Sequence, residues 1–122
     1  MIIGIPVTEK NRYDSAVGEH FGRVPYFAIV DTENDEIVLT ENTSHHKGGR
    51  GYPPELLRKN NVDVMVCKNL GRRAVSMFEN FGIEVYIGAT GTVRDALESF
   101  TDNQLQEATD KNACKEHKYH DR

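Results

Sequence analysis

The sequence predicts an α/β fold in which a mixed five-stranded sheet carries about three helices. Five short apolar segments, separated by turn residues, have the length and composition of strands. A short turn between the second and third segments is typical of an antiparallel hairpin. The last strands alternate with amphipathic segments, which is typical of parallel strands joined by right-handed helical crossovers. The sheet is therefore expected to contain both parallel and antiparallel pairs.

The first half of the chain is expected to supply three strands. Residues 2–7 are apolar at both odd and even positions, which indicates a strand covered on both faces. A long polar connection over residues 8–20 leads to the apolar strand Tyr26–Asp31. A turn at residues 33–35 joins this strand to Glu36–Asn42, which completes the hairpin.

The second half is expected to alternate helix and strand. In order, we expect a helix opened by Pro53-Pro54-Glu55, a strand over Val62–Cys67, a helix over Arg72–Phe81, a strand over Ile83–Ile87 and a helix over Val93–Phe100. Proline and glutamate suit the first turn of a helix. Gly82 follows the second helix at a position where glycine commonly ends helices. Thr92 and Asp95 resemble a capping box at the start of the third helix.

The length and overall composition limit the possible domain organisation and the kinds of partner that the protein can bind. A chain of 122 residues fits one domain, which we place at residues 1–105, followed by a polar tail at 106–122 that we expect to be flexible. The formal net charge is −4 and no long basic run exists, which argues against nucleic acid as a partner. No apolar run approaches the ~20 residues of a membrane span. We therefore expect a cytoplasmic protein, in which Cys67 and Cys114 stay reduced rather than form a disulfide.

Histidine and cysteine side chains are the first candidates for chemistry. His20 lies in the loop before the second strand, and His45 and His46 lie in a glycine-rich loop after the third. The hairpin could bring both loops to one rim of the sheet. Cys67 ends a predicted core strand at the edge where open α/β sheets bind ligands. Each candidate also has a non-functional interpretation. His20 could be a structural turn histidine, His45 and His46 could lie in an exposed loop, and Cys67 could be a buried cysteine that packs as a small apolar residue.

The tail carries a second candidate group with the spacing Cys114-x2-His117-x2-His120. Thiolate and imidazole are ligands for zinc, copper and iron–sulfur clusters, and this close spacing could surround a metal ion. The alternative is a solvated polar tail that contains these residues without using them.

Arginine and glycine residues suggest an anion site. Arg23, Arg50, Arg72 and Arg73 could together form a positive pocket for an anionic ligand, including a negatively charged metal–sulfur cofactor. The loop Gly88–Gly91 precedes a helix, and its N–H groups could hold an anion. This loop lacks the pattern of a nucleotide-binding P-loop. The alternative is that its glycines only form an ordinary turn between a strand and a helix.

A nucleophile is not evident. The chain has no GxSxG segment, and no serine is tied to a histidine and an acid by a recognised pattern. The residues alone therefore indicate no nucleophilic enzyme mechanism.

Several segments together resemble the dinitrogenase iron–molybdenum cofactor biosynthesis family. They are the strand Ile3–Val7, the loop His20–Arg23 with Pro25–Phe27, Asn61–Val64, Gly71 with Ala74, Gly82–Tyr86 and Thr92–Ala96. The resemblance covers about residues 1–100. The family includes NifX-type and NafY-type cofactor carriers and the C-terminal part of some NifB proteins.

The resemblance implies a ribonuclease-H-like sheet of order 3-2-1-4-5 with strand 2 antiparallel. It also implies non-catalytic binding or carriage of an iron–sulfur cluster or of an iron–molybdenum cofactor precursor, with a cofactor-assembly or acceptor protein as a possible partner. The candidate cofactor-binding residues that follow are His20, Arg23, His45, His46, Cys67 and Arg72. Two alternatives stay open: a hydrolase acting on a phosphorylated substrate at the Gly88–Thr92 loop, and a metal-binding or protein-interaction module that uses the tail.

Overall fold

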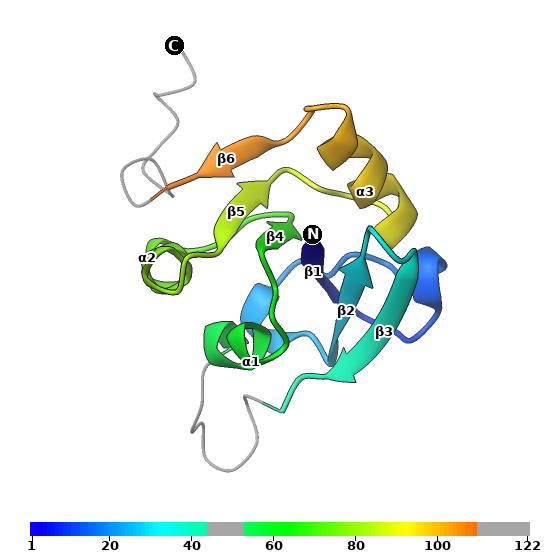
Figure 1. The fold of residues 1–122 in the computed structure, drawn as a ribbon, viewed down its shortest axis with the longest axis horizontal. Coiled ribbons are helices and arrows are strands. Elements are labelled where there is room, and N and C mark those ends of the chain that lie inside the picture. The colour runs from blue at the N-terminus through cyan, green and yellow to red at the C-terminus, as the bar shows by residue number, and fades with distance from the viewer. Residues whose placement is uncertain (44–52, 110–122) are drawn as a thin grey trace.

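The computed structural model of the chain describes residues 1–43 and 53–109 as one sheet with helices on both faces (Figure 1). The strands are β1 (Ile2–Val7), β2 (Tyr26–Asp31), β3 (Glu36–Glu41), β4 (Val64–Cys67), β5 (Glu84–Ile87) and β6 (Gln106–Ala108). The helices are α1 (Pro53–Lys59), α2 (Arg72–Asn80) and α3 (Val93–Thr101), with the short 3-10 turns η1 (Arg12–Asp14) and η2 (Phe21–Arg23).

The strand order confirms the predicted mixed sheet. The order is β3-β2-β1-β4-β5-β6, with β2 antiparallel to both of its neighbours and β1, β4 and β5 mutually parallel. The central strand β1 is buried from its second residue onward, as expected for a strand covered on both faces. This arrangement leaves the carboxyl ends of β1, β4 and β5 at one edge of the sheet, where the connecting loops gather.

The sheet has six strands, so the expected number of five was too low by one. β6 pairs antiparallel with β5 and continues the sheet into residues that the sequence assigned to the tail. Only Ala108 is buried in this strand, while Gln106 and Glu107 are exposed. A strand that buries a single small side chain has no hydrophobic pattern to reveal it. The remainder of the predicted tail, residues 110–122, lies outside the described residues.

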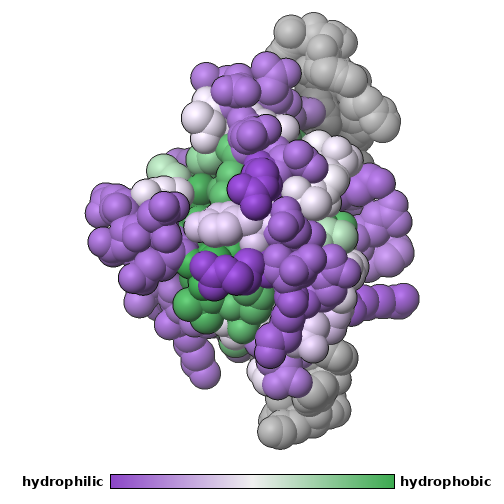
Figure 2. All heavy atoms as spheres, turned by 90° about the vertical axis from the view of Figure 1, so that its right-hand side faces the viewer, coloured by the Kyte–Doolittle hydropathy of each residue, from purple (hydrophilic) through white to green (hydrophobic). Residues whose placement is uncertain are grey.

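Two hydrophobic cores lie on opposite faces of the sheet. Phe27, Leu57, Met65 and Phe78 are fully buried on the face covered by α1 and α2. Ile3, Ile5, Val7, Val93 and Ala96 are buried on the face covered by α3. Seen from the side, apolar side chains gather in the middle of the surface and polar ones surround them (Figure 2).

Helix ends follow the local chemistry that the sequence predicts. The Thr92 hydroxyl accepts a hydrogen bond from the Asp95 N–H at 3.2 Å, and the Asp95 carboxylate accepts one from the Thr92 N–H at 3.0 Å. This is a complete capping box, which closes the N-terminus of α3. Gly82 follows α2 with φ +77°, a conformation that glycine adopts at little cost. Across residues 1–43 and 53–109, no helix has the length and apolar character needed to cross a membrane.

Candidate functional site

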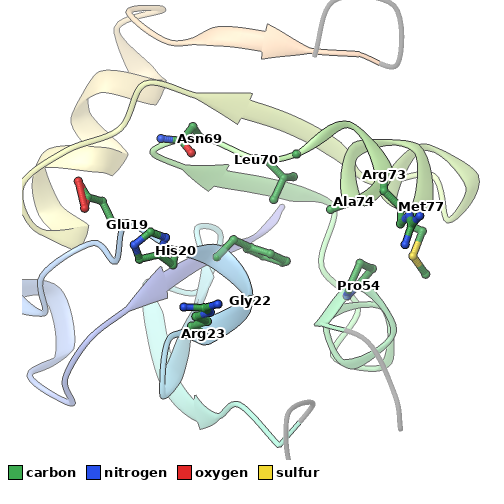
Figure 3. A pocket seen from close by; sticks show the side chains of 12 residues that line it. Glu19, His20, Gly22, Arg23, Pro54, Asn69, Leu70, Arg73, Ala74 and Met77 are labelled. Carbon is green, nitrogen blue, oxygen red and sulfur yellow. The ribbon is translucent and has the colours of Figure 1, made fainter. Parts of the chain in front are cut away.

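A cleft of about 480 Å³ opens beside the carboxyl end of β4 (Figure 3). One wall is the η2 turn, and the other is formed by the loop after β4, by α2 and by Pro54 of α1. The lining residues are Glu19, His20, Phe21, Gly22, Arg23, Pro54, Asn69, Leu70, Gly71, Arg73, Ala74 and Met77. The cleft lies at the carboxyl edge of a parallel strand, where open α/β sheets place their ligands.

The η2 wall is anchored by one aromatic side chain. Phe21 is 7% exposed and packs against Phe27 and Phe78, with ring centroids 5.4 and 5.6 Å apart. The Arg23 N–H donates to the His20 carbonyl at 2.9 Å and closes the turn. The buried ring therefore fixes a rigid turn whose two ends, His20 and Arg23, both line the cleft.

The opposite wall is built from the loop between β4 and α2. The Lys68 carbonyl accepts a hydrogen bond from the Gly88 N–H at 2.9 Å, which ties this loop to the end of β5. Gly71 is the N-cap residue of α2 and supplies no side-chain cap. Arg73 lines the cleft from the first turn of α2, and Met77 lines it from the next turn.

The cleft has an excess of positive charge. Neither the Arg23 nor the Arg73 guanidinium has an ion-pair partner among residues 1–43 and 53–109. Glu19 is the single carboxylate among the described lining residues, and it pairs with Lys68 at 2.8 Å. The hydrogen bond and charge of Lys68 hold the pKa of the Glu19 carboxyl below its usual value. Two guanidiniums that have no ion-pair partner in the described part of the chain, beside the electrically neutral Glu19–Lys68 pair, favour an anionic ligand.

The floor of the cleft is apolar. Phe21 and Leu70 are buried, and Ala74 and Met77 are partly buried beside them. Figure 3 shows Leu70 near the middle of the cleft, with His20 and Arg23 on one side and Arg73, Ala74 and Met77 on the other. An apolar floor lowers the local dielectric constant, so the charges on the walls act more strongly on a bound ligand than they would in water.

The other predicted anion site has a different geometry. At the N-terminus of α3, the Asp95 carboxylate already accepts the Thr92 N–H. A Cβ atom placed on Gly91 would clash with this carboxylate, which shows how closely it covers the turn. A phosphate at this turn would be repelled by the Asp95 carboxylate, and the N–H groups of Thr92 and Asp95 already donate to the capping box. The geometry of the Gly88–Thr92 loop therefore gives no support to a phosphate-binding hydrolase.

The structure places the sequence-predicted candidates in three different environments. His20 and Arg23 line the cleft together. Arg72 is exposed and does not line it, whereas its neighbour Arg73 does. Successive helical residues point about 100° apart, so only one of two adjacent arginines can face a given side. The candidates Arg50, His45, His46, Cys114, His117 and His120 lie outside the described residues, and their roles stay predictions.

Cys67 lies in the core rather than on the cleft surface. It is 1% exposed, and its Sγ atom lies 3.9 Å from the Tyr86 carbonyl oxygen. Burial raises the pKa of the Cys67 thiol to about 12. A thiol in this state is protonated at neutral pH and packs as a small apolar group.

We expect the Cys67 thiol to be unreactive while the protein is folded. In a Cys114→Ser variant, which leaves Cys67 as the only thiol, the disulfide reagent DTNB should react fully only after denaturant is added. The reason is that both exclusion of the reagent and the raised pKa suppress the reactive thiolate. Rapid labelling of the native variant would show that Cys67 is accessible, and Cys67 would then again be a candidate cofactor ligand.

Several lining residues were not singled out from the sequence. The sequence alone gives no reason to select Met77 or Asn69 as lining residues. Glu19 and Lys68 are 49 residues apart, so no local pattern indicates their ion pair. The available signal was the segment Gly71-Arg72-Arg73, in which a glycine at a helix start is followed by two cations.

Comparisons with known proteins find a matching family and proteins of similar sequence and structure. A family model described as "Dinitrogenase iron-molybdenum cofactor" matches residues 1–103. An uncharacterized protein of Methanocaldococcus jannaschii is 31% identical over 111 residues, which cover 87% of this chain and 90% of that protein.

Solved structures have the same fold. The NMR structure of a Thermotoga protein, described as a candidate NifB protein of the DUF35 family, matches with a TM-score of 0.74 and 32% identity. The match covers 87% of this chain and 91% of that chain. The apo form of the orange protein of Desulfovibrio gigas matches with a TM-score of 0.79 over 88% of this chain and 92% of that chain. At 24% identity, this second likeness is evidence for the fold alone.

Proposed function

The chain belongs to the dinitrogenase iron–molybdenum cofactor family, and from this premise we propose that it binds and carries a preassembled, negatively charged metal–sulfur cofactor or precursor. Family members take part in the biosynthesis and binding of the iron–molybdenum cofactor. The proposed binding site is the cleft between η2 and α2. The role is carriage rather than catalysis.

The observation that carries the proposal is the pair of guanidiniums of Arg23 and Arg73, which have no ion-pair partner among the described residues and line a cleft with an apolar floor. Guanidinium is weakly hydrated and presents several N–H donors in a fixed plane, so it releases water readily to bind a large, diffuse anion. Hydrogen bonds to the sulfur atoms of a metal–sulfur cluster also stabilise its negative charge. The two arginines extend from different walls, so one ligand between them could contact both.

The donor set of the cleft favours a cluster that is already complete. Among the described residues, no group of three or more histidine, cysteine, aspartate or glutamate side chains is placed to hold a metal ion. The Cys67 thiol is buried away from the cleft surface. Among the described lining residues, His20 alone carries an imidazole or thiol, so a cluster bound there keeps most of its own ligands. A preassembled cluster meets this condition, whereas assembly from iron and sulfide on four cysteines does not.

An open cleft also suits a carrier. A carrier must release its ligand to a cofactor-assembly or acceptor protein, and this requires that the partner can reach the site. The cleft is bounded by an exposed turn and by the exposed end of a helix rather than by a closed core. Charge and surface contact hold the ligand in the cleft. A partner protein with more ligating groups can therefore take the ligand over.

The role of His20 is tested by an anaerobic titration with tetrathiomolybdate, a soluble metal–sulfur dianion. His20→Ala should weaken its binding by about tenfold, since one coordinating or hydrogen-bonding contact is lost. Cys67→Ala serves as the control, because Cys67 lies in the core beneath the same region. Equal binding by His20→Ala and the unmodified protein would remove His20 from the site. The same titration of a His45→Ala, His46→Ala variant tests the pair predicted from the sequence.

A further inference from the structure

We propose that Glu19 determines the charge of the ligand that the cleft accepts, because it neutralises Lys68 and leaves two positive charges for a dianion. The inference rests on the proposed function of the cleft and names the ligand class more closely. It identifies Glu19 and Lys68 as specificity-determining residues.

The Glu19–Lys68 pair joins the two walls of the cleft. Glu19 directly precedes His20 on the η2 side, and Lys68 directly precedes Asn69 on the other side. Their side chains meet at 2.8 Å, and both are partly exposed, Lys68 at 40% and Glu19 at 58%. Glu19 itself lines the cleft, so the pair lies at the cleft surface, and both side chains are exposed enough to be altered without leaving a buried charge.

The charges of the described lining residues can be counted directly. Arg23 and Arg73 each contribute an unpaired positive charge, and the Glu19–Lys68 pair contributes no net charge. The two guanidinium charges match an anion that carries two negative charges. A more highly charged anion would favour a further cation, and Lys68, which is bonded to the lining residue Glu19, is engaged by that carboxylate.

Removing the Glu19 charge should release this third cation. Glu19→Gln leaves Lys68 without its carboxylate partner, so anions should bind more tightly. A unit charge several ångströms from the ligand in a partly solvated cleft corresponds to a gain of about three- to tenfold. The gain should be larger for pyrophosphate than for tetrathiomolybdate, because the interaction energy scales with the ligand charge. Adding Lys68→Gln to Glu19→Gln should remove the gain.

The chain offers a matched control for the change in net charge. Asp14 forms a comparable exposed ion pair with Arg94 at 3.3 Å, and neither residue lines the cleft. Asp14→Asn removes one negative charge from such a pair just as Glu19→Gln does. A general effect of net charge would appear in both variants, whereas a local effect would appear only in Glu19→Gln.

The experiment compares the unmodified chain with these variants in titrations with tetrathiomolybdate and with pyrophosphate at low salt. The inference predicts tighter pyrophosphate binding by Glu19→Gln alone, and a gain that shrinks as ionic strength rises. It is overturned if Glu19→Gln behaves like Asp14→Asn, or if Glu19→Gln weakens binding.

The outcomes separate this inference from the proposed function. If the unmodified chain binds tetrathiomolybdate and Glu19→Gln changes nothing, the carrier function stands and the charge selection fails. If the unmodified chain does not bind tetrathiomolybdate but Glu19→Gln gains pyrophosphate binding, the charge selection stands and the carrier function fails. If neither chain binds either anion, both proposals are wrong.

Discussion

Replacing Arg23 and Arg73 together by glutamine is expected to lower the affinity for tetrathiomolybdate by about a hundredfold. Each guanidinium should contribute about 1.4 kcal/mol through charge-assisted hydrogen bonds, and two independent contributions of this size multiply to that factor. Both side chains line the cleft and have no ion-pair partner among the described residues, so their removal should leave the fold unchanged. The measurement is an anaerobic equilibrium titration at constant ionic strength.

A second double variant controls for the loss of two positive charges. Arg58 stacks over the Phe81 ring at 4.8 Å, Arg94 pairs with Asp14, and neither arginine lines the cleft. Replacing Arg58 and Arg94 by glutamine should leave the affinity within about twofold of the unmodified value, because distant charges are screened by salt. An equal loss in both double variants would show that overall charge, rather than the cleft, attracts the anion.

Phe21→Ala is expected to lower the free energy of unfolding by about 3–5 kcal/mol. The Phe21 ring is 7% exposed and contacts both Phe27 and Phe78, so truncation removes buried area and leaves a cavity. A loss of this size is a large fraction of the roughly 5–15 kcal/mol that stabilises a typical domain. Urea unfolding followed by circular dichroism measures it.

The conservative variant Phe21→Leu separates the effect of filling the buried space from the effect of the aromatic ring itself. Leucine refills much of the space, so the loss should be clearly smaller than for alanine. A Phe21→Ala variant within about 1 kcal/mol of the unmodified protein would contradict the view that this ring anchors the η2 wall.

Much of the fold could be predicted from the sequence because strong local signals repeat along it. The hairpin between β2 and β3, the apolar strand β1 and the capping box of α3 each depend on residues close together in the chain. β6 could not be predicted in this way, since it buries only Ala108. Its pairing with β5 is a tertiary interaction, which no periodic pattern in the sequence indicates.

The cleft was only partly predictable, for a related reason. The loop that carries His20 and Arg23 was recognisable because its residues break a regular pattern just before a core strand. The sequence left two interpretations of Cys67 open, a ligand at the carboxyl end of its strand and a buried apolar residue, and the structure shows it buried like the other three residues of β4. The Glu19–Lys68 pair joins two loops 49 residues apart, and its existence follows only from the order of strands in the sheet.

The central claim is that the cleft binds a preassembled metal–sulfur anion. The most direct test incubates the protein anaerobically with a synthetic, water-soluble [4Fe–4S] dianion capped by 2-mercaptoethanol, removes unbound cluster by gel filtration and counts the iron. The account predicts roughly four iron atoms per unmodified chain, the content of one intact cubane cluster, and almost none with the Arg23→Gln, Arg73→Gln variant. Equal iron contents in the two proteins, or none in the unmodified protein, would contradict it.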